Sequence, residues 1–267
     1  MHFDAFDRYH HATSFIHRLD PRVKVVVTIA YILSNTLLPD GAWIAFGLAL
    51  LFLLYANALS NLGMAFTFKR SFVALPFALV AVTVLFSIPG QPLTTFHFIM
   101  WDFTITDMGL RRFESILVRS WLSVQMAILL VATTRFPDLI HAFEHLRVPS
   151  ILTTIIAFLY RYLFVLGDEV FRLLRAREAR SAASPAAAAG TRSGGSVAWR
   201  ARVAGHMAGQ LFLRSYERSD RVYNAMLARG YTGHLNTMNP HELHRIDYIS
   251  MASALIVILL LQVVGRL

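Results

Sequence analysis

The sequence of 267 residues contains no cysteine and, among its 25 basic residues, only two lysines. The absence of cysteine excludes disulfide bonds, a thiolate nucleophile and cysteine-ligated metal sites. Charged residues are also scarce, because they make up 15% of the chain, against about 25% in soluble domains. Residues 1–22 include three aspartates but no apolar run, so we expect no cleavable signal peptide there. These absences exclude a disulfide-stabilised domain and a thiol enzyme.

Apolar residues, by contrast, are abundant and gather in long blocks. They make up 56% of the chain, whose mean hydropathy is +0.52. A membrane-spanning helix needs about 20 mostly apolar residues, and five blocks are candidates: 22–38, 42–58, 72–89, 115–133 and 246–264. The sequence therefore predicts an all-α polytopic membrane protein with about five transmembrane helices. It excludes a soluble nucleic-acid-binding module, although the formal net charge is +9.

The segments between these blocks carry local structural signals. Asp20 and Pro21 are suited to the N-cap and the first position of the first helix. Residues 39–41, with the sequence Pro-Asp-Gly, predict a tight turn between the first two spans. Residues 90–112 are rich in proline, threonine and aromatic residues, including Trp101, and we expect a loop near the membrane interface.

Residues 134–245 differ from the rest, because they hold 15 of the 25 cations. Two long helices are expected here, at about 150–180 and about 199–229, with a shorter amphipathic helix at 137–146 before them. The small-residue stretch 181–198 contains Pro185 and paired glycines, which predicts a flexible linker between the two long helices.

The apolar stretch 151–166 admits two interpretations. It contains Arg161 and continues directly into charged sequence, so we interpret it as part of a partly embedded amphipathic helix; the alternative is a sixth span. With five spans and a cytoplasmic N-terminus, 21 cations lie in the cytoplasm and three outside, as the positive-inside rule requires. A sixth span would reverse this bias. We therefore divide the chain into a membrane domain, a cytoplasmic region and a C-terminal transmembrane helix, at 1–133, 134–245 and 246–267.

No constellation in the sequence indicates catalysis. There is no phosphate-binding Gly-x-x-x-x-Gly-Lys-Ser/Thr loop, and none of the eleven histidines lies in a predicted span. Two histidine pairs have helical spacing for a metal but lack a third ligand at a convincing spacing: His141/His145 and His241/His244. The other candidate is His10/His11, with Asp4 and Asp7 nearby. We expect all three pairs to be solvated or interfacial. The sequence thus predicts neither catalytic residues, nor a metal site, nor a cofactor.

The most informative segment is 214–230. Arg214, Arg218 and Arg221 recur at spacings of four and three, so they share one helical face, and Glu217 can pair with Arg221. Gly230 is well placed as a left-handed helix cap, which would put Arg229 in the last turn. Such an arginine is suited to an acidic pocket on a partner. The alternative is a basic helix that lies on anionic lipid.

The sequence also resembles a known family. It is similar to the transmembrane (T) component of energy-coupling-factor (ECF) transporters, specifically the CbiQ proteins of cobalt uptake systems. The matching segments are His17–Lys24, Pro137–Ile140, Leu146–Pro149, Tyr160–Tyr162 with Asp168-Glu169, and Arg214–Gly230. The resemblance implies two coupling helices, each ending in a short Ala-Arg motif that docks on a cytoplasmic pair of ATPase subunits.

Carried over by position, the two docking motifs are Ala176-Arg177-Glu178 and Ala228-Arg229-Gly230. The first departs from Ala-Arg-Gly at Glu178, so we expect its helix to continue to Arg180. Two further arginines, Arg119 and Arg161, lie at or near membrane depth. They either take part in helix coupling or extend to the headgroups.

The expected function is mechanical. The resemblance implies that the chain links an ATPase dimer to a substrate-binding membrane subunit in an ATP-driven importer, with Co²⁺ as the cargo and Ni²⁺ or a vitamin as alternatives. It implies no nucleic-acid partner and a multi-pass location in the inner membrane. A rival of another class is a membrane enzyme that acts on phosphorylated lipid through His141, His145 and the arginine cluster. A third is a structural anchor for a soluble partner.

Overall fold

The computed structural model describes residues 9, 12–98, 101–180, 196–233 and 243–267. The chain forms two compact units, which are described separately. Unit 1 comprises residues 1–146 and 239–267, and unit 2 comprises residues 147–238. The elements of unit 1 are α1 (Phe15–Arg18), α2 (Pro21–Leu37), α3 (Trp43–Ser60), α4 (Met64–Arg70), η1 (Ser71–Ala74), α5 (Leu75–Ser87), β1 (Pro92–Phe98), β2 (Trp101–Thr106), α6 (Asp107–Thr133), α7 (Phe136–His145) and α10 (Arg245–Val264).

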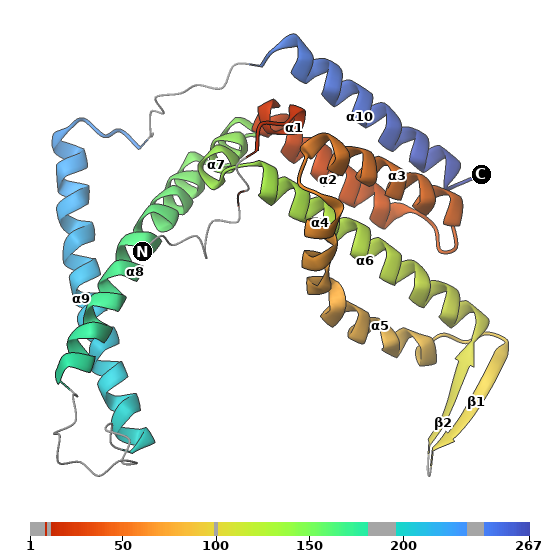
Figure 1. Cartoon of the computed structure of the whole chain (residues 1–267), viewed down its shortest axis with the longest axis horizontal. Coiled ribbons are helices and arrows are strands. Elements are labelled where there is room, and N and C mark those ends of the chain that lie inside the picture. Colours follow the sequence, from red (N-terminus) through yellow and green to blue (C-terminus); the bar gives the residue numbers. More distant parts are fainter. Residues whose placement is uncertain (1–8, 10–11, 99–100, 181–195, 234–242) are drawn as a thin grey trace. The chain divides into compact units, whose positions relative to one another are not determined.

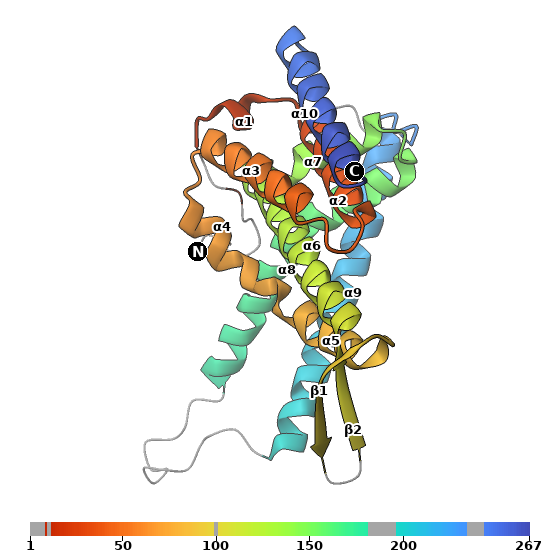
Figure 2. The same ribbon diagram turned by 90° about the vertical axis from the view of Figure 1, so that its right-hand side faces the viewer.

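The core of unit 1 lies where α2, α3, α6 and α10 pack together (Figures 1 and 2). Its buried side chains are mostly aliphatic, with Tyr31 and Leu122 among the most deeply buried. The start of α2 agrees with the prediction, since Pro21 is the first helical residue and Asp20 accepts a hydrogen bond from the Arg22 N–H at 2.8 Å. The described helices thus confirm an all-α polytopic membrane protein.

The individual spans differ in part from the prediction. By length and composition, α3, α6, α8 and α10 can each cross a membrane. The predicted span 22–38 forms α2, which has 17 residues and at 1.5 Å per residue is about 26 Å long. Helix α8, which contains 151–166, is thus also long and apolar enough to span. The interpretation of 151–166 as an amphipathic segment therefore depends only on the positive-inside distribution of the basic residues.

The predicted span 72–89 falls on a bent part of the chain. It covers most of η1 and all of α5, and the chain bends by 56° between Ala65–Ala74, which includes most of α4, and Leu79–Ser87. Pro76 lies in the first turn of α5. Proline has no N–H to donate and its ring collides with the carbonyl four residues earlier, so it bends or ends a preceding helix. The pair counts as one span only in its bent form.

The loop predicted at 90–112 is also corrected. Most of it forms an antiparallel hairpin of β1 and β2, with Thr95 opposite Thr104, and this segment is rich in the β-branched and aromatic residues that favour strands. Helix α6 then begins at Asp107, because the Thr106 hydroxyl accepts a hydrogen bond from the Gly109 N–H at 3.1 Å. The hairpin adds a small sheet to an otherwise helical protein.

Unit 2 contains two long helices, α8 (Ser150–Arg180) and α9 (Val197–Ala228), which pack against each other. Their bounds agree with the predicted helices at 150–180 and 199–229. Of the predicted linker 181–198, residues 181–195 lie outside the described residues. The predicted helix at 137–146 forms α7, but α7 packs on α2 in unit 1.

Candidate coupling site

The second predicted docking motif lies at the end of α9. Gly230 adopts a left-handed conformation, with φ of 81°. Its N–H donates to the carbonyl of Leu227 at 3.0 Å, and the Tyr231 N–H donates to that of Met226 at 3.0 Å. This pair of bonds is a Schellman motif, so the predicted glycine cap is confirmed. Arg229 is the C-cap residue and is exposed.

The first predicted motif lies inside α8 rather than at its tip. Ala176, Arg177 and Glu178 are helical, and α8 continues to Arg180, as expected for a motif that lacks the capping glycine. Arg177 is half-buried, whereas Ala176 and Glu178 are exposed. The arginines of the two motifs therefore differ in setting, since Arg229 lies at a capped end and Arg177 within the last turn.

A buried carboxylate joins the two helices of unit 2. Glu169 of α8 accepts a hydrogen bond from Arg172 of the same helix and another from Arg214 of α9, whose Nη1 lies 2.5 Å from Oε1. The side chain of Glu169 is 10% exposed, while those of the two arginines are more than half exposed. Arg214, predicted to share a basic face with Arg218 and Arg221, also pairs with Glu169 across the helix interface.

Electrostatics keep this carboxylate ionised. Glu169 lies beyond the apolar part of α8, and the hydrogen bond from Arg214, helped by the positive charge of Arg172, holds the pKa of its carboxyl below the ordinary value. The predicted pair of Glu217 and Arg221 is also present, with 3.9 Å between Oε2 and Nη1, but both side chains are about two-thirds exposed. That pair lies within α9, and exposed pairs of this kind contribute little to stability. The hydrogen bond between Arg214 and Glu169, by contrast, links α9 to α8.

The side of α9 away from Glu169 is apolar and exposed. No residue of α9, all of which the structure describes, is buried. At 100° per residue, four large side chains lie within about 60° of one another around the helix, roughly opposite Arg214 and Arg221. We call them the α9 stripe, and they are between 47% and 69% exposed: Phe212, Tyr216, Tyr223 and Leu227. Contiguous exposed apolar side chains mark surfaces that contact a partner or a membrane.

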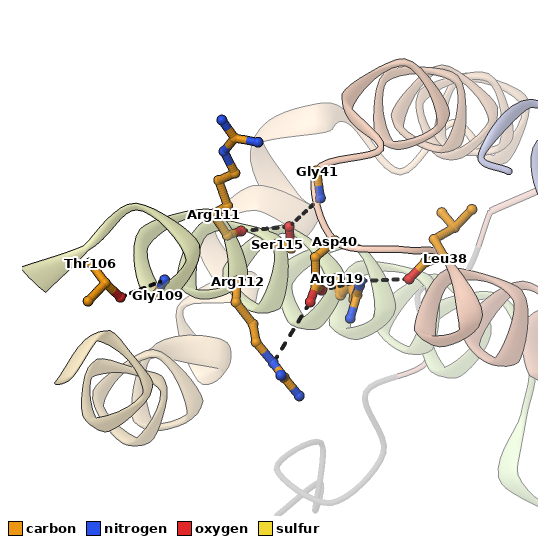
Figure 3. Close-up of polar contacts among 9 residues, drawn as sticks. All are labelled: Leu38, Asp40, Gly41, Thr106, Gly109, Arg111, Arg112, Ser115 and Arg119. Atoms are coloured by element: carbon orange, nitrogen blue, oxygen red, sulfur yellow. Dashed lines mark hydrogen bonds and ion pairs between the residues drawn. The ribbon is translucent and has the colours of Figure 1, made fainter. Parts of the chain in front are cut away.

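Arg119, for which two roles were open, has protein partners. Its Nη2 lies 2.6 Å from the carbonyl oxygen of Leu38 and 2.7 Å from Oδ1 of Asp40, in the turn between α2 and α3 (Figure 3). Ser115 supports the same turn by accepting a hydrogen bond from the Gly41 N–H at 3.0 Å. Arg119 therefore ties this turn to α6, a structural role. Arg161 is exposed on α8.

Of the histidine candidates, His141, His145 and His244 lie in the described part of the chain. The rings of His141 and His145 lie 4.6 Å apart on α7, and His244 is the N-cap residue of α10. Residues 10, 11 and 241 lie outside the described residues. Within the part of the chain that the structure describes, no three histidine, aspartate or glutamate side chains lie close enough together to hold a metal ion.

Comparisons with known proteins bear on this arrangement. An uncharacterized protein of Methanocaldococcus jannaschii is 26% identical over 98% of this chain and 86% of its own. The energy-coupling factor transporter transmembrane protein EcfT of Brevibacillus brevis is 26% identical over 96% of both chains. The nickel permease LarQ of Lactiplantibacillus plantarum is 31% identical over 47% of this chain and 41% of its own. The model of the CbiQ family, described as cobalt transport protein, matches residues 12–240. The chain therefore belongs to the CbiQ family, the transmembrane components of ECF-type importers.

Proposed function

We propose that the protein is the coupling subunit of an ATP-driven ECF-type importer of Co²⁺. The observation that carries the proposal is the contrast within the chain between a packed helical bundle and a helix pair that leaves Arg229, at the end of α9, and the α9 stripe exposed. A subunit that transmits movement needs such a surface for its partners. The family's description favours cobalt, and the name of the partial relative LarQ makes nickel the alternative.

The ATPase partners would dock at Ala176–Glu178 and Ala228–Gly230. A guanidinium is always charged and makes paired hydrogen bonds to a carboxylate, and the Schellman motif fixes the backbone beside Arg229. Arg214, Arg218 and Arg221 would support docking through their charge. Since the chain contains no phosphate-binding loop, ATP would be hydrolysed by an ATPase dimer, and the metal would be held by a separate membrane subunit.

The proposed topology places the N-terminus and residues 134–245 in the cytoplasm, on the strength of the charge distribution. The chain has no cysteine, so single cysteines can be introduced without background. A membrane-impermeant thiol reagent applied to intact cells should label a cysteine at position 90 and leave one at position 194 unlabelled. Labelling at position 194 would contradict this topology.

The function is tested by reconstitution. The chain is co-expressed with an ATPase pair and a substrate-binding membrane subunit of its ECF system, and the purified complex is placed in vesicles. We expect uptake of labelled Co²⁺ that requires ATP, together with weaker uptake of Ni²⁺. The isolated chain should neither hydrolyse ATP nor bind Co²⁺ with micromolar affinity. A chain that turned over a phosphorylated lipid by itself would instead be a membrane enzyme.

A further inference from the structure

Helix α2 contacts the two helices of unit 1 that come directly before and after unit 2 in the sequence. The chain leaves unit 1 after Leu146 and re-enters it at Asn239. The last element before the exit is α7 and the first element after the return is α10. Both helices pack against α2. Any movement that reaches unit 1 along the backbone therefore arrives at helices seated on α2.

A buried carboxylate fixes α10 to α2. Asp247, in the first turn of α10, accepts a hydrogen bond from the Asp20 N–H at 3.0 Å, and its other oxygen accepts one from the His244 N–H at 2.9 Å. Asp20 in turn caps α2. Both aspartates are about 95% buried. One side chain thus sets the start of α10 and its position on α2 together.

A buried ammonium fixes the other connection. Lys24 lies one turn further along α2, and its Nζ donates to the carbonyl of Thr133 at 3.1 Å and to that of His17 at 3.2 Å. Thr133 ends α6, three residues before α7 begins. The residue after Lys24, Val25, is 1% exposed and packs with Leu139 and Ala142 of α7.

These residues share one small cavity of about 250 Å³. Asp20, Lys24 and Asp247 line it together with Asp138 of α7. Asp247 and Lys24 are buried charged groups that are hydrogen-bonded to backbone, and such groups are costly to separate from their partners because a buried charge is then left uncompensated. Charged hydrogen bonds are also directional. The hydrogen bonds of these buried charged groups therefore resist sliding of the neighbouring helices along α2, which purely apolar contacts would allow.

We propose that Asp20, Lys24 and Asp247, here named the α2 polar cluster, act as positioning residues that hold both connections on α2, so that movement of unit 2 is transmitted to the membrane helices. This proposal rests on the proposed function as a coupling subunit. It predicts that damage to the cluster leaves the partner subunits bound and hydrolysing ATP, but separates hydrolysis from transport. A merely structural role would lower both activities in proportion to the amount of folded complex.

The test uses the complete reconstituted complex and measures Co²⁺ uptake per ATP hydrolysed. Lys24→Met keeps the length of the side chain and removes its charge. We expect ATP hydrolysis to stay within about twofold of the wild type while uptake per ATP falls by about tenfold or more. The matched control is Asp40→Asn, which removes a paired charge from the α2–α3 turn of the same unit. It should leave uptake per ATP within about twofold.

A second variant covers the case in which Lys24→Met does not fold. Asp247→Asn, which keeps the size of the side chain and one acceptor oxygen, is then measured in the same way. An unchanged ratio in a folded cluster variant, or an equal fall in Asp40→Asn, would overturn the proposal. Loss of folding in both cluster variants, judged by gel filtration, would also overturn it, because the cluster would then serve stability. If the wild-type complex shows no ATP-driven uptake, the proposed function itself fails, which is seen before any variant is compared.

Discussion

Unit 1 and unit 2 are stabilised in different ways. Unit 1 buries a continuous apolar core and closes it with polar ties such as Arg119 to Asp40 and Asp247 to Asp20. In unit 2, α9 buries no residue, and its Arg214 pairs with Glu169 of α8. Burial of apolar surface is the dominant stabilising term in folding. Unit 2 therefore has the character of a surface that other molecules complete, whereas unit 1 has an apolar core of its own.

The largest expected effect comes from reversing the charge at the tip of α9. Losing a buried charge-assisted contact at an interface typically costs about 2–5 kcal/mol, or roughly thirty-fold to several-thousand-fold in affinity. Arg229→Glu should abolish Co²⁺ uptake and release the ATPase subunits, and Arg177→Glu should do the same less completely. Uptake and co-purification measure this, with membrane insertion checked by fractionation.

The control for charge reversal is Arg192→Glu, in the predicted linker and outside the described residues. It should change uptake little. Equal and mild effects at Arg229 and Arg192 would mean that the basic helices rest on lipid. Unit 2 would then not depend on protein partners, and the contrast with unit 1 would not hold.

A smaller effect is expected from the α9 stripe. Phe212→Ser combined with Tyr223→Ser should weaken assembly with partner subunits by about thirty-fold, as for a central interface residue. The helix content measured by circular dichroism should not change, because neither side chain is buried in the chain alone. Trp199→Ser removes an exposed aromatic side chain of α9 outside the stripe, and it serves as the control that should leave assembly intact.

A subtler test addresses the link inside unit 2. The pKa of Glu169 is lowered, so its contribution is fully present above the unfolded value of about 4.3 and is lost as the pH falls through the folded value. Spin labels on cysteines at positions 171 and 213 should report a wider distance distribution at low pH. Glu169→Gln should produce that width at neutral pH, whereas Glu217→Gln should not. A narrow distribution in Glu169→Gln would show that apolar contacts alone hold the pair.

The smallest effect is expected in the predicted linker. Removing four residues around Gly194 should leave assembly and uptake unchanged, because closing a loop costs only about 0.6 kcal/mol for each doubling of its length. Co-purification of the ATPase subunits measures the outcome. Loss of the complex after this deletion would identify 181–198 as a structured contact.

Signals within a few residues predicted much of the fold. Asp20 with Pro21 set the start of α2, Gly230 set the end of α9, and the missing glycine at Glu178 correctly predicted a longer α8. The bend near Pro76 had an equally local cause, but the apolar run around it favoured a straight span.

Contacts between residues far apart in the chain were not predictable in this way. Arg214 and Glu169 are 45 residues apart, and Arg119 and Asp40 are 79 apart. Helical spacing placed Arg214 on a face but could not give its partner, because the pairing depends on how two separate helices pack. The roles of the docking motifs depend on other chains and stay predictions.

The end of α9 also has a mechanical consequence. Residues 210–228 contain neither glycine nor proline, and at 1.5 Å per residue they form a rod about 28 Å long. Gly209 precedes this rod, and a side chain at that position would meet no atom within 4 Å apart from the neighbouring backbone of α9. If the helix pivots there by about 10°, simple leverage displaces its tip by about 5 Å. A small rotation of this part of α9 would thus move Arg229, at its end, by about the length of one helical turn.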